Sequence, residues 1–358
     1  MRHAGFVAAA KVKTLGRFIA MSRVLVTGAN GFIGAHLVRA LVTHGDDVSC
    51  LVRIGACLDR IRDQPVRLCY GDVTQPATLH SAVRNMEIVY HLAGATRASG
   101  RFQEVNSIGT GYVAQVCAEQ TRPPVLVLVS SLAAAGPAPT GRVRHEIDRP
   151  IQVSQYGRSK RAGELNAQRF AHRVPITVIR PPIVLGEMDR VGLDLFRCVA
   201  RYRVAFVPGL ARHRHSVIHA RDLAQLLILA AERGKRLRPG LENGSGTSQG
   251  YYFAASEANP SFDELGRMIA AALEQPYVLC IPVAMPLVWL MAGGGELLSR
   301  LARRPVYLNL DKAAEVTAGA WVCSGRAACE ELGFRVGACL QQRIRETATW
   351  YRQVQWLE

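Results

Sequence analysis

The stretch that decides the fold is Val24-Leu25-Val26-Thr27-Gly28-Ala29-Asn30-Gly31-Phe32-Ile33-Gly34. A short β-branched run meets a glycine-rich turn, and a helix-forming segment follows at once at residues 34–41. In such a turn Gly28 permits the sharp bend, Gly31 leaves room for a pyrophosphate against the backbone, and Gly34 permits close packing of helix on strand. The N–H groups and the dipole of the following helix favour a bound anion. Because the glycines stand between a strand and a helix, they predict a dinucleotide site rather than a structural turn.

The composition is that of an ordinary globular protein, apart from its charge. Of the 358 residues, 49% are hydrophobic and 20% are charged, which allows a large core. The formal net charge of +16 is a feature of proteins that meet nucleic acid, anionic lipid or phosphorylated ligands. Here the arginines are scattered and few aromatic residues lie between them. We therefore expect a generally basic protein with no nucleic-acid partner.

Cysteine and histidine usage argues against a metal site. The nine cysteines form neither a CxxC pair nor a zinc-like spacing, which predicts reduced thiols in a cytoplasmic protein. Three histidines, His213, His215 and His219, fall within seven residues, but arginines alternate with them and no carboxylate or cysteine joins them. This pattern favours a basic rim that faces an anionic substrate or cofactor over a metal centre.

Residues 1–20 and residues 277–295 give expectations about the N-terminus and about membrane contact. Residues 1–20 are basic and mildly apolar, so we expect a disordered extension, or a true start at Met21. Residues 277–295 have no charge over a length that approaches a membrane span. Prolines and glycines interrupt this segment, which predicts a buried strand at 278–283 and then a helix from Pro286. A peripheral membrane contact is the alternative, which we do not expect.

Strand-like and helical segments alternate through the first half of the chain. After the first strand and helix, further strands are expected at residues 47–53, 66–70, 87–94, 125–129 and 176–179. The run at 125–129 is the most apolar and is expected near the centre of a parallel sheet. The alternation predicts an α/β fold with a Rossmann-type doubly wound parallel sheet, formed by residues 21–180.

Beyond Pro182, predicted strands and helices no longer alternate regularly. We assign residues 181–358 mainly to a smaller C-terminal substrate-binding lobe, with segments near 216–234 and 250–255 returning to the Rossmann core. Helices are expected in this part at 262–273, 286–303 and 341–356.

Residues at the ends of the strands are candidates for cofactor contact. Arg53 ends the second strand, where proteins that bind NAD usually have an acidic residue, and a guanidinium there would pair with a 2′-phosphate. This favours NADP over NAD, unless Arg53 stacks on adenine or faces solvent. Asp72 follows the third strand and either reaches the adenine amino group or caps the helix expected at 76–84. The predicted cofactor contacts are Gly28, Asn30, Gly31, Phe32, Ile33, Gly34, Arg53, Asp72, Val73, Leu92, Ala93, Gly94, Tyr156, Lys160 and Pro182.

A tyrosine and a lysine four residues apart supply the candidate chemistry. Tyr156 and Lys160 lie at the start of a predicted helix and share one of its faces. The ordinary pKa of a phenol lies far above neutrality, and a lysine ammonium one turn away favours the phenolate. Ser131, at the end of the strand at 125–129, is placed to hold a substrate oxygen. Tyr156 would exchange a proton with that oxygen while a nicotinamide exchanges hydride at the same carbon.

The chain resembles the extended short-chain dehydrogenase/reductases of the NAD-dependent epimerase/dehydratase family. This group includes nucleotide-sugar epimerases, dihydroflavonol reductases and 3β-hydroxysteroid dehydrogenases. The resemblance runs from Met21 to the C-terminus and is strongest up to about Gly186. The TGxxGxxG turn of the family matches residues 27–34, and its YxxxK pair matches Tyr156 and Lys160.

Other motifs of the family match single positions. The catalytic serine of the family matches Ser131, the asparagine before a Gly-Thr pair matches Asn106, and the acid after the third strand matches Asp72. The remaining matches are the RPP…G motif at Arg180 to Gly186 and the HxxD motif at His219 and Asp222. The resemblance implies that Ser131, Tyr156, Lys160 and Asn106 are catalytic and that the substrate is a small molecule. It also implies, as an option, a homodimer formed through helices at 104–119 and 156–172.

Departures from the family pattern narrow the choice of reaction. The similar 4,6-dehydratases have Asp-Glu after the catalytic hydroxyl residue, whereas this chain has Leu132-Ala133 and so lacks an acid/base pair for elimination. The similar UDP-sugar epimerases place an arginine where this chain has His215, and a tyrosine where it has Ala135. The apolar region at 278–298 is similar to that of steroid- and flavonoid-type members. We expect hydride transfer at a larger, less polar alcohol or ketone; a nucleotide-sugar epimerase and a non-catalytic NADP-binding sensor or assembly protein are the alternatives.

Overall fold

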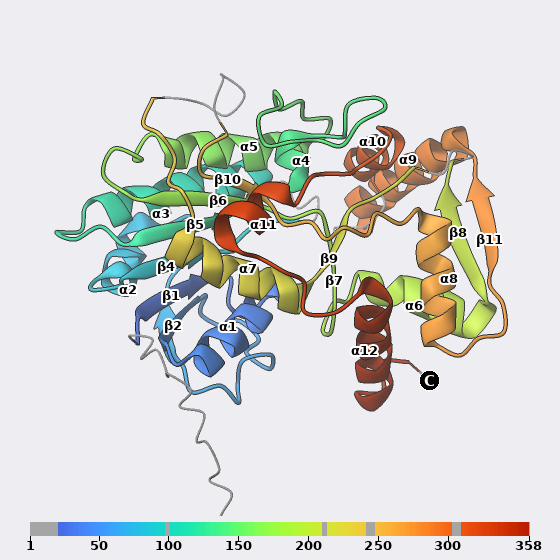
Figure 1. Cartoon of the computed structure of the whole chain (residues 1–358), viewed down its shortest axis with the longest axis horizontal. Coiled ribbons are helices and arrows are strands. Elements are labelled where there is room, and N and C mark those ends of the chain that lie inside the picture. Colours follow the sequence, from blue (N-terminus) through green and yellow to red (C-terminus); the bar gives the residue numbers. More distant parts are fainter. Residues whose placement is uncertain (1–20, 97–100, 210–212, 241–247, 303–308, 358) are drawn as a thin grey trace, which may run out of the picture.

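Seven parallel strands form the centre of the protein, with helices on both faces and a smaller lobe beyond one end (Figure 1). The computed structural model describes residues 21–96, 101–209, 213–240, 248–302 and 309–357. The extension expected at residues 1–20 lies outside the described residues.

The sheet has the strand order β10-β6-β5-β4-β1-β2-β3, and every neighbouring pair is parallel. Its strands are β1 (Arg23–Thr27), β2 (Asp47–Val52), β3 (Arg67–Tyr70), β4 (Ile88–His91), β5 (Val125–Val129), β6 (Ile176–Arg180) and β10 (Tyr251–Phe253). The predicted doubly wound parallel sheet is therefore confirmed. Strand order reverses between β1 and β4, which is where such sheets bind ligands at the carboxyl ends of their strands.

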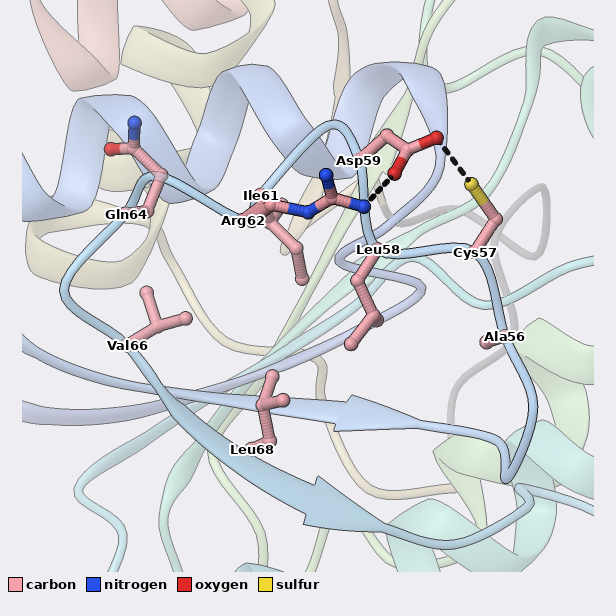
Figure 2. Close-up of a pocket in the computed structure, with 9 residues that line it drawn as sticks. All are labelled: Ala56, Cys57, Leu58, Asp59, Ile61, Arg62, Gln64, Val66 and Leu68. Atoms are coloured by element: carbon pink, nitrogen blue, oxygen red, sulfur yellow. Dashed lines mark hydrogen bonds and ion pairs between the residues drawn. The ribbon is translucent and has the colours of Figure 1, made fainter.

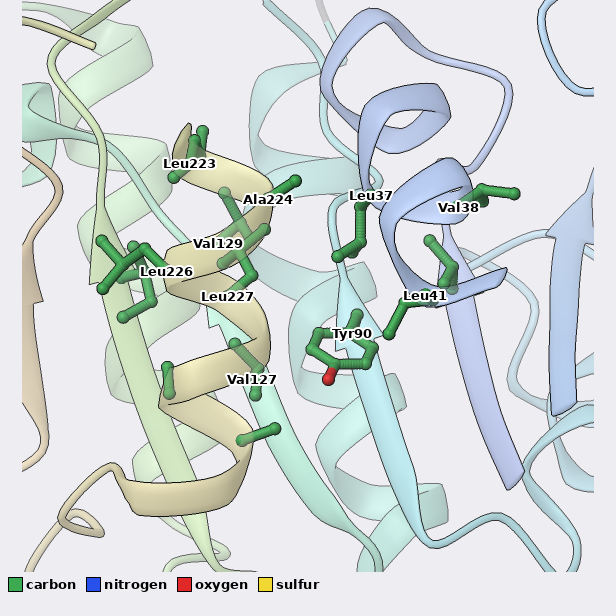
Figure 3. Packing of buried hydrophobic residues seen from close by; sticks show 14 of the residues in the cluster. Leu37, Val38, Leu41, Tyr90, Val127, Val129, Leu223, Ala224, Leu226 and Leu227 are labelled. Carbon is green, nitrogen blue, oxygen red and sulfur yellow. The ribbon is translucent and has the colours of Figure 1, made fainter. Parts of the chain in front are cut away.

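The apolar faces of the helices explain how both sides of the sheet are covered. One side is covered by α1 (Phe32–His44), α7 (Ala220–Arg233) and α11 (Arg326–Leu332), the other by α2 (His80–Val83), α3 (Thr110–Ala118) and α5 (Gln155–Gln168). On the first side, Leu37 and Leu41 of α1 and Leu227 of α7 are fully buried with Tyr90 and Val127 of the sheet (Figure 3). Apolar residues at helical spacing thus form one continuous layer on the strands.

Two of the expected helices are interrupted. The segment expected to be one helix from 104 to 119 begins as wider π-helical turns at Gln103–Gly109 and becomes α-helical only in α3. The helix expected at 76–84 is a 3₁₀ turn, Pro76–Thr78, followed by α2. Such wider turns often occur at functional sites, and here they include Asn106.

The smaller lobe is built from α6 (Gly192–Tyr202), β8 (Val204–Pro208), α8 (Phe262–Ala272), β11 (Leu279–Val283), α9 (Met285–Ala302), α10 (Leu310–Thr317) and α12 (Leu340–Gln353). Its core joins Phe196, Ile269, Ile344 and Tyr351. A short parallel pair, β7 (Ile183–Leu185) with β9 (Val217–His219), follows the sheet, and α4 (Leu132–Ala135) follows β5.

The segment at 277–295 differs from expectation in its burial. β11 is not a buried strand: the side chain of Leu279 is 59% exposed, because only one face of the β8–β11 pair packs against α8. The following helix starts at Met285 and continues through the three glycines. In the described part of the chain, none of the helices combines the length and apolar content that crossing a bilayer requires. The nine cysteines are free thiols.

Candidate active site

The glycine turn is closely packed at two of its three glycines and open at the third. Gly28 has a φ of +71°, and a Cβ there would lie 2.7 Å from the backbone nitrogen of Ala93. A Cβ on Gly34 would lie 2.1 Å from the carbonyl oxygen of Gly28. A Cβ on Gly31 would meet only the Gly28 oxygen, at 3.1 Å. Gly28 and Gly34 therefore allow the turn to form, while Gly31 is restricted only by the Gly28 oxygen.

The start of α1 fits a bound anion. Gly31 occupies the N-cap position without a side-chain cap, so the first N–H groups of the helix have no side-chain acceptor. Asn30, Phe32 and Ile33 are half-exposed beside it. The start of α1 therefore has the features that a dinucleotide pyrophosphate requires: a glycine without a side chain, uncapped N–H groups and a helix dipole.

The loop after β4 lies directly against the glycine turn. The backbone nitrogen of Leu92 donates to the Thr27 carbonyl (3.1 Å), and that of Ala93 donates to the Thr27 hydroxyl (3.2 Å). A Cβ on Gly94 would lie 3.2 Å from Oδ1 of Asn106 and 3.7 Å from Nζ of Lys160. The missing side chain of Gly94 therefore leaves the lysine head accessible from the path predicted for the cofactor.

The predicted adenine end of the site combines Arg53 and Asp72. Arg53 is exposed directly after β2, and its charge lies close enough to influence Asp72. Burial raises the pKa of Asp72, but hydrogen bonds from Thr74 and the nearby Arg53 outweigh this and hold the pKa below its ordinary value. The Asp72 carboxylate accepts from the backbone nitrogen of Thr74 at 2.9 Å, so it closes its own turn rather than capping the helix at 76–84. The side chain of Val73 packs against Gly109.

Hydrogen bonds hold the β2–β3 loop over the glycine turn. The sequence did not indicate these contacts. The side-chain amide of Asn30 donates to the Cys57 carbonyl (3.1 Å), and Arg60 donates to the Met188 carbonyl (2.9 Å). This loop and β3 enclose an open cavity of about 440 Å³, lined mainly by apolar side chains that include Leu58, Val66 and Leu68 (Figure 2). None of the predicted site residues is in its lining.

Ser131, Tyr156 and Lys160 come together at the carboxyl edge of the sheet. Ser131 follows β5 and caps α4, its hydroxyl accepting from the backbone nitrogen of Ala133 (3.1 Å). The Tyr156 hydroxyl lies close enough to Ser131 for the serine side chain to lower the pKa of the phenol. Lys160 is buried one helical turn further along α5, and its ammonium donates to the Val129 carbonyl at 2.7 Å.

The surroundings of Tyr156 keep its phenol protonated. Burial raises the pKa of Tyr156, the nearby Ser131 side chain partly offsets this, and the carboxylate of Glu315 raises it further. Burial lowers the pKa of Lys160 to about 8. In this structure the Lys160 ammonium binds the Val129 carbonyl, and a phenolate at Tyr156 stays a prediction. A protonated phenol next to Ser131 is a proton donor.

Asn106 is fully engaged in holding the site together. Its Oδ1 accepts from the backbone nitrogen of Ala95 (2.7 Å), while its Nδ2 donates to the Ala95 carbonyl (3.0 Å) and to the Ser159 hydroxyl (2.9 Å). These contacts join the loop after β4 to α5 and are those of a positioning residue. A catalytic role of Asn106 stays a prediction.

The start of α5, the helix that carries Tyr156 and Lys160, is bound by two carboxylates of α10. Local sequence patterns did not indicate these contacts. Asp311 accepts from the backbone nitrogens of Gln155 and Tyr156, the latter at 3.1 Å. Glu315 accepts from the hydroxyl of the N-cap residue Ser154 at 2.7 Å. Negative charge at a helix N-terminus is stabilising. Because the partners are more than 150 residues apart, no local signal could have found this contact.

A buried ion pair joins α5 to strand β6 of the sheet. Glu164 of α5 accepts from Arg180 of β6 at 2.6 and 2.8 Å and from Arg161 at 2.9 Å. The Arg180 guanidinium also lies over the Tyr251 ring, 4.5 Å from its centre. The arginine of the RPP motif thus fixes α5 to the sheet, and Pro182 is half-buried just beyond it.

The histidines do not form the expected basic rim. His215 is buried with its ring 4.4 Å from that of Phe262, and His219 is buried beside Glu187. Burial lowers the pKa of both histidines to about 4, so both are neutral near pH 7. Asp222, the acid of the HxxD motif, binds Arg343 of α12 at 2.6 Å. The prediction of a rim that includes His215 and His219 is wrong because the folded chain removes both from solvent.

Comparison with known proteins agrees with this geometry. The model of the NAD dependent epimerase/dehydratase family matches residues 24–241. "Ceramide reductase" of Caulobacter vibrioides is 31% identical over 338 residues, which cover 93% of this chain and 96% of that protein. "Sterol demethylase protein B" of Methylococcus capsulatus is 30% identical over 59% of this chain and 66% of its own. The fold is similar to that of a UDP-glucose 4-epimerase from Thermotoga maritima, with a TM-score of 0.73, 16% identity and coverage of 93% of this chain and 99% of that one.

Proposed function

This chain belongs to the NAD-dependent epimerase/dehydratase family, and from that we propose that it is an NADP(H)-dependent oxidoreductase that interconverts a ketone and a secondary alcohol on a large, weakly polar substrate. At the coarser level it is an enzyme of the oxidoreductase type that uses NAD or NADP as its cofactor.

The observation on which the proposal depends is the placement of Tyr156 beside the segment that follows Ser131, with Lys160 one turn further along α5. A nicotinamide bound along the glycine turn would supply or accept the hydride. Ser131 would hold the substrate oxygen by a hydrogen bond. Tyr156, protonated as it is, would donate its proton to that oxygen in the direction of reduction. The Lys160 ammonium lies beside Gly94, on the side where the cofactor would bind.

The substrate class is inferred from what the site lacks and from the relatives. Leu132 and Ala133 are buried apolar residues, so no acid/base pair for the elimination of water follows Ser131. His215, at the position where similar epimerases grip diphosphate, is buried and neutral. The relative that matches nearly the whole chain is named as a reductase of ceramide, a lipid. These points support a lipid ketone or alcohol over a nucleotide sugar.

The preference for NADP rests on Arg53. It is exposed at the end of β2, the strand next to β1, where a 2′-phosphate of a bound dinucleotide would lie. The Asp72 carboxylate accepts hydrogen bonds from Thr74 and also lies within the electrostatic influence of Arg53 and Arg101.

The proposal is tested by Tyr156→Phe, with Tyr112→Phe on α3 as the matched control. NADPH affinity is measured by fluorescence titration, and NADPH oxidation is followed with the ketone form of a ceramide in micelles, a 3-ketosteroid and UDP-glucose. We expect turnover of a lipid ketone, a loss of about 10²–10⁴-fold in kcat for Tyr156→Phe, and an unchanged NADPH affinity. Near-normal rates in Tyr156→Phe would exclude it as proton donor, and UDP-glucose turnover without added cofactor would favour an epimerase.

A further inference from the structure

Helix α9 has one buried face and one exposed apolar face. Val288 and Ala292 pack against Ala313 of α10. The opposite face exposes five large apolar side chains to solvent, with exposed fractions between 47% and 73%: Leu287, Leu290, Met291, Leu297 and Leu298. Their spacing places them on one stripe of the helix. Residues 285–298 contain a single charged residue, Glu296.

The β8–β11 pair continues this apolar exposure. Val204 pairs with Leu279, and Phe206 pairs with Ile281, so these four side chains share one face of the pair. The other face packs on α8, where Ala205 lies against Gly266. On the outer face Phe206 is 56% exposed and Leu279 is 59% exposed. Ala284 alone separates β11 from α9, so the two apolar faces follow each other directly in the chain.

Arginines stacked on tyrosines stand at the other end of the same strand pair. The Arg203 guanidinium lies 5.2 Å from the centre of the Tyr277 ring, and that of Arg201 lies 5.6 Å from the Tyr202 ring. All four side chains are exposed. The exposed acid nearest to them in the chain is Glu274. Amphipathic aromatic rings and long cationic side chains are the groups that favour the boundary between water and lipid.

We propose that this region docks on the surface of an anionic lipid bilayer. The interfacial surface is defined by Phe206, Leu279, Leu287, Leu290, Met291, Leu297 and Leu298. Large exposed apolar side chains gathered on one helix face in this way mark interaction sites in soluble proteins. The net charge of +16 attracts the chain to anionic lipid and opposes the approach of a second copy. Because no helix in the described part of the chain is able to cross a bilayer, the contact is peripheral.

The interfacial surface is one helix away from the catalytic residues. α10 packs on the buried face of α9, and its Asp311 binds the first backbone nitrogens of α5, next to Tyr156. Docking would thus bring the catalytic helix near the phase in which a lipid substrate resides. This link to catalysis rests on the proposed function, whereas the docking itself does not.

Vesicle flotation of the purified full-length chain tests the proposal. Vesicles of phosphatidylcholine alone are compared with vesicles that also contain phosphatidylglycerol. We expect binding to the anionic vesicles that weakens with salt, and a loss of about tenfold in affinity for Leu290→Glu or Leu297→Glu. Ile147→Glu, which changes an apolar side chain that is 55% exposed outside the interfacial surface, is the matched control and keeps its binding. The double change Arg201→Gln and Arg203→Gln weakens binding to anionic vesicles.

Unchanged NADPH affinity and melting temperature show that each variant is folded. The proposal is overturned if the wild-type chain floats with neither vesicle, or if Leu290→Glu binds as well as wild type. It is also overturned if ultracentrifugation shows a dimer that Leu290→Glu converts to monomer, because a second copy then covers the surface. Failure of docking leaves NADPH oxidation in detergent micelles intact, which separates it from failure of the proposed function.

Discussion

Replacing Gly34 by alanine and replacing Gly31 by alanine are expected to affect different properties of the protein, although both glycines belong to the same turn. A Cβ on Gly34 would stand 2.1 Å from the Gly28 oxygen and 2.8 Å from the Cα of Ala29. A Cβ on Gly31 would have one neighbour within 4 Å, the Gly28 oxygen at 3.1 Å. Gly34→Ala is therefore expected to disrupt the fold, and Gly31→Ala to disrupt cofactor binding.

The magnitudes follow from these distances. Ordinary contact begins near 3.4 Å, so Gly34→Ala requires the start of α1 to move about 1.3 Å away from the turn. Overpacking of a close-packed interior costs about 1–3 kcal/mol, and a clash with backbone belongs at the upper end. That is a large part of a total stability of about 5–15 kcal/mol. Gly31 has a φ of −75°, which alanine adopts without strain, and its Cβ requires the Gly28 oxygen to move by only about 0.3 Å. Its loss of stability is therefore expected to be smaller, about 1 kcal/mol with the altered N-cap.

Urea unfolding followed by circular dichroism and titration with NADPH distinguish the two effects. We expect Gly34→Ala to unfold at a much lower urea concentration, and Gly31→Ala to unfold near the wild-type midpoint but to bind NADPH at least about tenfold more weakly. Gly293→Ala is the control, because its Cβ meets nothing within 4 Å and alanine favours a helix. Wild-type NADPH affinity in Gly31→Ala would refute the placement of the pyrophosphate, and wild-type stability in Gly34→Ala would refute the packing argument.

Three further predictions concern specificity, a buried ion pair and pH. Arg53→Asp should shift the ratio of NADP to NAD affinity toward NAD; an unchanged ratio in paired titrations would show that Arg53 does not bind the 2′-phosphate. Glu164→Gln removes the buried carboxylate that pairs with Arg180 and should cost about 3–5 kcal/mol in urea unfolding; a loss below about 1 kcal/mol would contradict the role of the pair. Burial lowers the pKa of His36 and His219 from the ordinary 6.5 to about 4, so the unfolded chain binds more protons between these values. Stability should fall as the pH is lowered from about 6.5 to about 4, and a flat urea midpoint over that range would disprove it.

Matched controls make the first two of these tests specific. Glu330→Gln removes an exposed partner of Arg326 and should cost less than about 1 kcal/mol, unlike the loss of Glu164. Arg62→Asp changes an exposed arginine of the same β2–β3 loop and should leave the NADP to NAD ratio as it is.

Local patterns in the sequence were enough to predict the sheet and to place Tyr156 and Lys160 on one face of a helix. Three features depend on backbone geometry within a few residues: the glycine turn, the alternation of strands and helices, and the spacing of Tyr156 and Lys160. They are therefore visible without tertiary structure. The parallel seven-stranded sheet confirmed that part of the prediction. The pairing of β10 with β6 extends the sheet by a strand far along the chain, at residues 251–253.

Only the tertiary structure decided which groups are desolvated and which distant residues meet. An apolar run has the same composition whether it is buried or exposed, so the sequence could not show that β11 and α9 leave one face in solvent. The neutral state of His215 follows from its burial against Phe262, and the protonated state of Tyr156 from its burial near Glu315. The contact of Asp311 with the start of α5 joins segments 155 residues apart. Local chemistry is encoded by spacing along the chain, whereas charge states and long-range contacts depend on how the elements pack.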